Sequence, residues 1–120
     1  MNIPIILGAV EFTTTGTALL SDSRAQVIPT KYALQVTGVD VNGAAAAPTS
    51  WDVLLLASLD GLVYNEASKI LEHVNTANGN GDVIFSEGKF YPSLFWQVKC
   101  KAITLGATAV KIKIRVLGVK

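Results

Sequence analysis

The feature that most constrains the fold is a strict alternation of apolar and polar side chains near the C-terminal end of the chain. From 96 to 102 every second residue is apolar, and from 110 to 116 the pattern returns with lysine and arginine at the positions between. A period of two is that of a β-strand, whose successive side chains point to opposite faces of the sheet. Both segments are therefore predicted to be strands with one buried face and one face in water.

Similar short runs, rich in Val, Ile, Leu, Thr and aromatic residues, continue along the chain and are separated by clusters of Gly, Asn, Asp, Pro and Ser. Such runs and clusters are typical of strands and turns, and helix signals are scarce. The predicted strands are 5–13, 31–39, 51–58, 62–65, 68–75, 82–86, 93–103 and 109–118. About eight short strands predict an all-β fold, an antiparallel two-sheet sandwich that is jelly-roll-like, in a single domain spanning 1–120.

The loop 103–108 is expected to join the two alternating segments as a hairpin. With the turn centred at Gly106, the apolar positions of one strand lie opposite those of the other. This register places Lys101 opposite Lys111 on the wet face. The same face then carries a basic stripe, made of Lys99, Lys101, Lys111, Lys113 and Arg115.

Like charges directly opposite each other destabilise a sheet, so the basic stripe needs an explanation. The long side chains can splay into solvent beside Asp52 or Glu72 from neighbouring strands. The stripe can also be a docking face for an acidic surface of a partner protein. A platform for nucleic acid, completed by Phe95, is disfavoured because the formal net charge is only +1 and such platforms depend on a strongly positive groove.

The chain is more apolar than an ordinary soluble monomer. Hydrophobic residues make up 50% of it and charged residues 16%, against about 25% charged residues in an average domain. The segment 51–58 is apolar on both sides, as in a central strand covered on both faces. No apolar stretch approaches the roughly 18 residues of a membrane helix. We therefore expect contacts between subunits, in a homo-oligomer or a docked subunit, and no membrane partner.

The first ten residues are apolar except for Asn2, and Glu11 follows them. No basic residue precedes the apolar run, which makes it a poor signal peptide. The single Cys100 excludes an internal disulfide and agrees with a reducing compartment. The protein is thus expected to be made in the cytoplasm and not secreted. Residues 1–10 are a candidate N-terminal assembly arm that adds as a strand to a neighbour through Ile3, Ile5 and Leu7.

The chain shows no recognisable catalytic site. His73 is the only histidine, so any histidine-based proton transfer must involve it. No Ser or Cys lies in an elbow such as Gly-x-Ser-x-Gly, which favours an ordinary structural or surface histidine. Cys100 shares a face with Trp96 and Val98, and is interpreted as a buried, inert thiol. The protein is predicted not to be an enzyme, although distant strands can still bring two carboxylates together.

The loop 75–82 contains two Asn-Gly pairs, which are the strongest short turn signal. Asn78, Asn80 and Asp82 imitate the alternating oxygen ligands of a calcium loop. The required Gly is missing from the next position, and Lys89 stands where the loop needs Glu. The same stretch lacks the lysine and the following helix of a phosphate loop. No metal and no cofactor are expected.

The stretch 51–64, Trp-Asp-Val-Leu-Leu-Leu-Ala-Ser-Leu-Asp-Gly-Leu-Val-Tyr, resembles a recurrent pattern in small β-sandwich virion structural proteins of tailed bacteriophages and prophages. In that pattern a hydrophobic strand ends in Ser-Leu-Asp-Gly and an aromatic residue follows, here Tyr64. Asp60-Gly61 supplies the side-chain hydrogen bonding and the positive φ of a tight turn. The strand 93–103 looks like the family's aromatic-led strand, with Gln or Lys where Arg is common.

This resemblance covers residues 31–120 and implies a non-enzymatic protein located in the virion. Its implied role is capsid decoration, or a minor head or tail component, through self-association and docking to other virion proteins such as the major capsid protein. Nucleic acid is not an expected partner. The alternative is a carbohydrate-binding or receptor-binding module, in which exposed Trp51, Tyr64, Tyr91 or Trp96 would stack on sugar rings. Exposure of these rings distinguishes the two interpretations, and the strand pattern buries Trp96.

Overall fold

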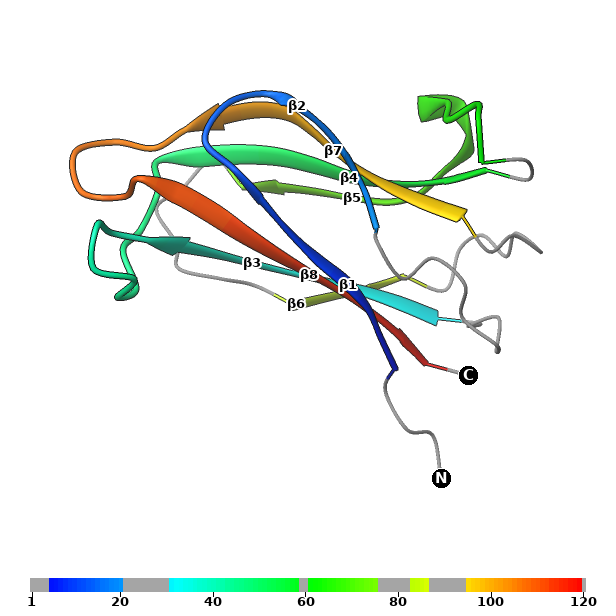
Figure 1. Cartoon of the computed structure of the whole chain (residues 1–120), viewed down its shortest axis with the longest axis horizontal. Coiled ribbons are helices and arrows are strands. Elements are labelled where there is room, and N and C mark those ends of the chain that lie inside the picture. Colours follow the sequence, from blue (N-terminus) through cyan, green and yellow to red (C-terminus); the bar gives the residue numbers. More distant parts are fainter. Residues whose placement is uncertain (1–4, 21–30, 59–60, 76–82, 87–94, 120) are drawn as a thin grey trace.

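The computed structural model describes residues 5–20, 31–58, 61–75, 83–86 and 95–119. They form eight strands and one turn of 3-10 helix, η1. In chain order these are β1 (Ile5–Phe12), β2 (Gly16–Leu19), β3 (Lys31–Val39), β4 (Ser50–Ser58), η1 (Glu66–Ser68), β5 (Lys69–Asn75), β6 (Val83–Ser86), β7 (Phe95–Thr104) and β8 (Lys111–Val119). The strands make two sheets that pack face to face (Figure 1).

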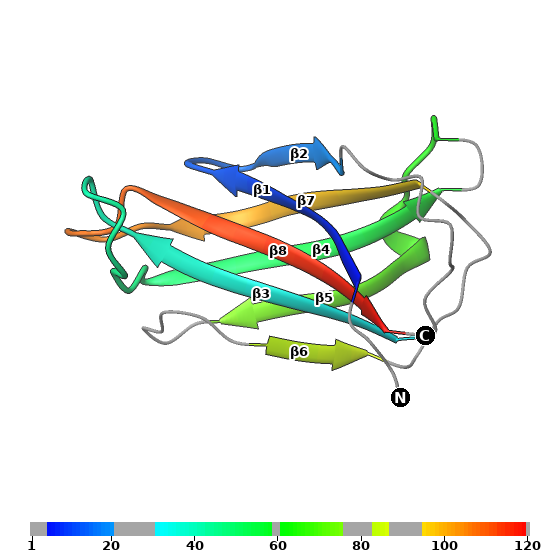
Figure 2. The same ribbon diagram turned by 60° about the horizontal axis from the view of Figure 1, so that its bottom comes forward.

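The first sheet has the order β1-β8-β3-β6 and the second the order β2-β7-β4-β5. All neighbours are antiparallel. Every connection passes from one sheet to the other except that between β4 and β5, which is the strand order of a jelly roll. The predicted fold class is therefore confirmed. Figure 2 shows the first sheet turned toward the viewer, with β8 between β1 and β3.

The predicted strands match the structure with two exceptions. Residues 62–65 were expected to be a strand, but they are bends and extended chain that lead into η1. The short β2 was not predicted, because only Ala18 of its four residues is half-buried and the alternation is too brief to read.

The predicted hairpin between the last two strands is wrong. β7 pairs with β4 and β2, whereas β8 pairs with β3 and β1. The loop between them turns at Gly106, which has a φ of 81°, and crosses from the second sheet to the first. The apolar faces do meet, but across the core, where Val98 and Cys100 of β7 and Ile112 and Ile114 of β8 are buried. A period of two shows which side of a strand is buried, and it is the same for both arrangements.

The core between the sheets is built around three large rings. Tyr32, Trp51 and Trp96 are almost completely buried. The rings of Tyr32 and Trp96, from opposite sheets, lie 6.4 Å apart between centroids with an interplanar angle of 58°. Tilted aromatic pairs of this kind stabilise a core beyond the area that they bury.

The central strand of the second sheet is covered on both faces, as its sequence predicts. Val53 and Leu55 belong to the core, while Leu54 and Leu56 lie on the other face and are 0% and 1% exposed. η1 contacts β4 and lies above the outer face of the second sheet (Figure 1). The chain itself therefore covers part of the apolar surface for which subunit contacts were expected.

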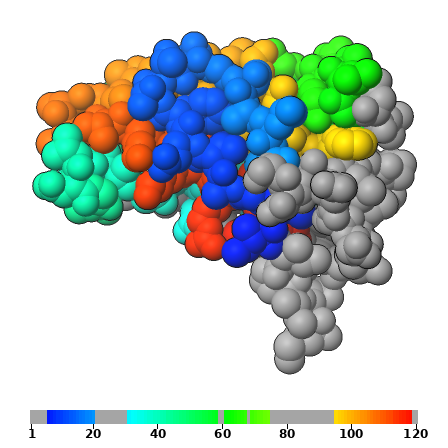
Figure 3. Space-filling view, in the orientation of Figure 1, coloured from blue at the N-terminus to red at the C-terminus, as the bar shows by residue number. Residues whose placement is uncertain are grey.

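Residues 5–10 are not an assembly arm. They belong to β1, which pairs with β8 of the same chain, and Leu7 is 1% exposed in the core. Ile3 lies outside the described residues, and of Ile5 only the backbone is described. An edge strand and an arm share the same alternating pattern, so only the pairing distinguishes them. β1 and β2 form neighbouring edges of the two sheets, and their blue atoms lie together on the face seen in Figure 3.

Candidate functional site

The predicted basic stripe is divided between the two outer faces of the sandwich. Lys99 and Lys101 lie on β7 in the second sheet, whereas Lys111, Lys113 and Arg115 lie on β8 in the first. The expected like-charged pairs across a ladder therefore do not form. This correction follows from the jelly-roll connection, which places the two strands in different sheets.

In the second sheet both lysines are paired with one carboxylate. Lys99 Nζ lies 2.7 Å from Glu66 Oε2, and Lys101 Nζ lies 3.3 Å from Glu66 Oε1. Their hydrogen bonds hold the pKa of Glu66 below its usual value. Glu66 begins η1, which is capped by the side chain of Asn65 accepting from the backbone N–H of Ala67 at 2.9 Å. These ion pairs tie η1 to β7. The ion pairs are made with Glu66, which was not predicted. The predicted Asp52 and Glu72 do lie near enough for the charge of Lys101 to act on the pKa of each.

Asp52 and Glu72 instead form a pair of carboxyl groups on neighbouring strands of the second sheet. Burial, together with the hydrogen bond and the charge of Glu72, raises the pKa of Asp52 to about 6. The pKa of Glu72 is lowered by its hydrogen bonds with Asp52 and with Lys69, whose Nζ lies 2.9 Å from Glu72 Oε1. Asp52 therefore keeps a proton at mildly acid pH, where an isolated Asp has already lost its own.

In the first sheet the pairing is less complete. Glu11 on β1 lies 3.2 Å from Lys111 Nζ and 3.8 Å from Lys113 Nζ. Within the described part of the chain, Arg115 has no carboxylate within the 4.0 Å of an ion pair. The second-sheet half of the basic stripe therefore has one carboxylate for two cations, and the first-sheet half has one carboxylate for three.

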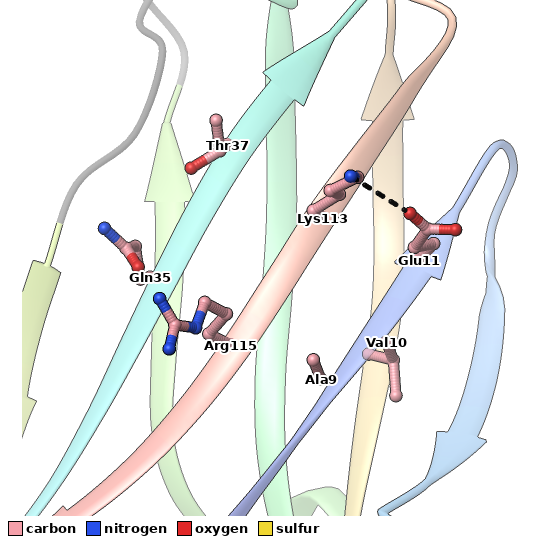
Figure 4. Close-up of a pocket in the computed structure, with 7 residues that line it drawn as sticks. All are labelled: Ala9, Val10, Glu11, Gln35, Thr37, Lys113 and Arg115. Atoms are coloured by element: carbon pink, nitrogen blue, oxygen red, sulfur yellow. Dashed lines mark ion pairs between the residues drawn. The ribbon is translucent and has the colours of Figure 1, made fainter. Parts of the chain in front are cut away.

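Arg115 lies beside a shallow hollow of about 650 Å³ on the outer face of the first sheet (Figure 4). Two rows of cross-strand neighbours build it, one from Ala9, Arg115 and Gln35 and the next from Glu11, Lys113 and Thr37. Figure 4 shows the guanidinium beside Gln35, with the small Ala9 on the opposite side. Sequence reasoning identified the cations but missed Ala9, Gln35 and Glu11, because strand pairing alone brings them together.

The single histidine and the single cysteine of the chain are both buried. His73 is 3% exposed, and its Nδ1 accepts a hydrogen bond of 3.4 Å from Nε1 of Trp51. The two rings meet edge to face at 5.4 Å. Burial raises the pKa of the Cys100 thiol to about 11, so it stays protonated at neutral pH. The structural interpretation of both residues is supported by these contacts.

Two of the four aromatic residues of the sugar-binding alternative are buried. Trp51 is 1% exposed and Trp96 0% exposed, so neither offers a ring face to a ligand. Tyr64 is half-buried, and Tyr91 lies outside the described residues. The calcium-like positions Asn78, Asn80, Asp82 and Lys89 also lie outside them.

The described residues were also searched for metal-ligand clusters and for membrane-spanning helices. Among these residues, no three His, Cys, Asp or Glu side chains come together as a metal site. The described part of the chain also contains no helix that is long and apolar enough to cross a membrane.

Comparison with known proteins gives a likeness of fold. No family model matches the chain, and no curated protein matches it. Among solved structures, the chain is similar to the SPBc2 prophage-derived protein YomS, with a TM-score of 0.50 and 9% sequence identity over 100% of this chain and 94% of that chain. A likeness at this identity shows the fold alone, and the fold is therefore one that a prophage-derived protein shares.

Proposed function

We propose that the chain is a non-enzymatic virion structural protein, a capsid decoration protein or a minor head or tail component. It is made in the host cytoplasm, and it acts by self-association and by docking to other virion proteins such as the major capsid protein. The observation that carries this proposal is the jelly-roll sandwich, which matches a prophage-derived protein along the whole chain. Jelly rolls are a common architecture of viral capsid domains, although lectins and cupins use them too.

The segment after β4 also supports the proposal, because it carries the resemblance to phage proteins. Gly61 has a φ of 78°, which a tight turn at this glycine requires, and its backbone N–H donates to Oγ of Ser58 at 3.0 Å. Leu59 and Asp60 lie outside the described residues. A Cβ at Gly61 would lie 3.0 Å from the ring of Phe95. The two segments that carry the resemblance to phage proteins therefore lie against each other, and the glycine is required by both the turn and this contact.

Self-association is supported by apolar side chains that the fold leaves in water. Ile6 on β1 is 57% exposed, Leu19 on β2 is 59% exposed and Val74 on β5 is 55% exposed. β1 and β2 are edge strands that adjoin at one side of the sandwich, where unpaired backbone groups are also available. Apolar residues on edge strands are costly in a monomer and suit a contact between subunits.

A non-enzymatic role is supported by the state of His73 and Cys100. The imidazole is buried against Trp51, and the thiol is buried and protonated. A nucleophile or a general base has to reach its substrate, which these positions do not allow.

The direct test is mass spectrometry of particles purified from the phage, or from the induced prophage strain, that encodes the chain. We expect the chain in the particles at a fixed ratio to the major capsid protein through repeated density-gradient steps. An abundant cytoplasmic host protein serves as the control for carry-over. If the chain is lost in parallel with that control, the virion proposal is wrong.

A further inference from the structure

The outer face of the first sheet carries a positive charge that the described residues do not neutralise. The carboxylate of Glu11 forms ion pairs with Lys111 Nζ at 3.2 Å and with Lys113 Nζ at 3.8 Å. Arg115 is the next residue of β8 on the same face, and it forms no ion pair with a carboxylate of the described part of the chain. The side chain of Arg115 is exposed, so its guanidinium is available to a partner.

The neighbours of Arg115 are suited to hold a carboxylate. The guanidinium presents a planar fork of N–H donors that matches a carboxylate in a bidentate arrangement. Gln35, its cross-strand neighbour on β3, adds an amide beside it (Figure 4). Within the described residues neither Gln35 nor Thr37 makes a side-chain hydrogen bond, so their polar atoms are also available. On the other side, the single methyl group of Ala9 leaves the hollow open.

We infer that this hollow docks an acidic segment of a partner protein, with a carboxylate of that segment on Arg115 and Gln35. The inference rests on the proposed virion function and names the chemistry of the partner surface. The two rows run across β1, β8 and β3, so a segment lying over them would place an Asp or Glu at Arg115. A backbone N–H or a hydroxyl could then contact Glu11 in the next row.

An acidic protein segment suits the hollow better than a nucleic acid does. The carboxylate of Glu11 lies in the hollow and would repel a continuous row of phosphates. The net charge of +1 supplies no long-range attraction for a polyanion. The lysines of the second sheet do not extend the surface, because both are paired with Glu66 on the opposite side of the sandwich.

The inference is tested by chemical-shift titration of the ¹⁵N-labelled full chain with a synthetic Ser-Gly-Glu-Gly-Ser peptide, blocked at both ends so that Glu carries its only charge, at low ionic strength, about 0.01 M, where surface charges are little screened. We expect the largest shifts at Ala9, Gln35 and Arg115. Arg115→Ala should weaken binding about fivefold or more, the usual effect of losing a charge-assisted hydrogen bond. Lys101→Ala removes the same charge from the other sheet and should change the affinity less than about twofold.

A second variant tests the local geometry without removing the arginine. Gln35→Glu is isosteric and places a carboxylate beside Arg115, so it should compete with the peptide and reduce binding as strongly as Arg115→Ala. An unchanged amide spectrum outside the hollow shows that the variant is folded. Equal shifts around Lys99 and Lys101, or tighter binding of oligothymidylate than of the peptide at the same residues, would overturn the inference.

The outcome for the hollow is separable from that for the virion role. If Arg115→Ala is incorporated into particles as well as the natural chain and the peptide titration shows no preference for the hollow, the docking site fails while the virion function stands. If the chain is absent from purified particles, the virion function fails regardless of the peptide result.

Discussion

At the scale of single residues, the ion pairs and the carboxyl pair show how strand neighbours determine charge states. Glu66 accepts from two lysines and Glu11 lies near two others, although neither carboxylate lies close to its partners in the sequence. Asp52 is the opposite case, because its strand neighbour Glu72 is another acid. Each of these groups is ordinary in sequence and acquires its properties from the strand beside it.

The raised pKa of Asp52 predicts a specific pH dependence of stability. Its pKa is about 6 in the folded protein against an ordinary value of 3.8, so between these values the folded state binds more protons than the unfolded state. The contribution of Asp52 to the free energy of unfolding is therefore full below about pH 4 and is lost as the pH rises through about 6. Solvent and the neighbouring Glu72 limit the loss to about 1 kcal/mol.

Asp52→Asn should remove this dependence, because the amide can still donate to Glu72 but does not titrate. Urea unfolding of both proteins at a series of pH values between 4 and 7 measures it. The natural chain should lose stability relative to the variant as the pH rises. Parallel curves for the two proteins would contradict the assignment.

At the scale of the elements, β1 shows that one apolar alternation is compatible with both an assembly arm and an edge strand of the same chain. Its apolar alternation suggested an arm for a neighbouring subunit, but β1 pairs with β8 in its own sheet. The bulge between Ile6 and Gly8 leaves Leu7 facing the core while Ile6 faces water. The two adjacent residues therefore provide a matched comparison.

Leu7→Asp should destabilise the monomer, because it buries a carboxylate among apolar side chains at a cost of about 3 to 5 kcal/mol. Ile6→Asp changes a side chain that is 57% exposed and should leave thermal unfolding close to that of the natural chain. Circular dichroism melts of both variants provide the measurement. Equal melting temperatures for the two would mean that β1 is not part of the folded sandwich.

At the scale of the whole molecule, the excess of apolar residues divides between the core and the surface. Both faces of β4 are buried within the chain, which accounts for part of the excess. The exposed Ile6, Leu19 and Val74 lie on edge strands. Among the described residues, four more large apolar side chains are exposed outside the strands, those of Val41, Leu62, Val63 and Val110. The folded chain therefore buries part of its apolar excess and still exposes apolar side chains of the kind that the proposed self-association requires.

The proposed self-association predicts an oligomer whose mass by light scattering is insensitive to salt, because apolar contacts are not screened. Leu19→Ser should shift the mass toward that of the monomer, while Lys101→Ala should not. A monomer at every salt concentration would remove the support for self-association and leave a docked subunit as the form of the virion proposal.

Much of the fold could be predicted from the order of the amino acids. The alternation in 96–102 and 110–116 indicated two strands and their buried faces, the double-sided apolar run indicated the covered central strand, and the Asp-Gly pair at 60–61 indicated a turn at which Gly61 has the positive φ. These features follow from local rules, because the direction of a side chain and the φ of a turn depend on only a few neighbouring residues.

Only the tertiary structure shows which strands pair with each other. The sequence is equally compatible with β7 and β8 side by side or facing each other across the core, and with β1 as an arm or an edge. The choice depends on which distant strands bury the most surface together, and no local pattern records it. The candidate site followed the same rule: its cations are visible in the sequence, but Ala9, Gln35 and the distribution of carboxylates around Arg115 come from strands far apart along the chain.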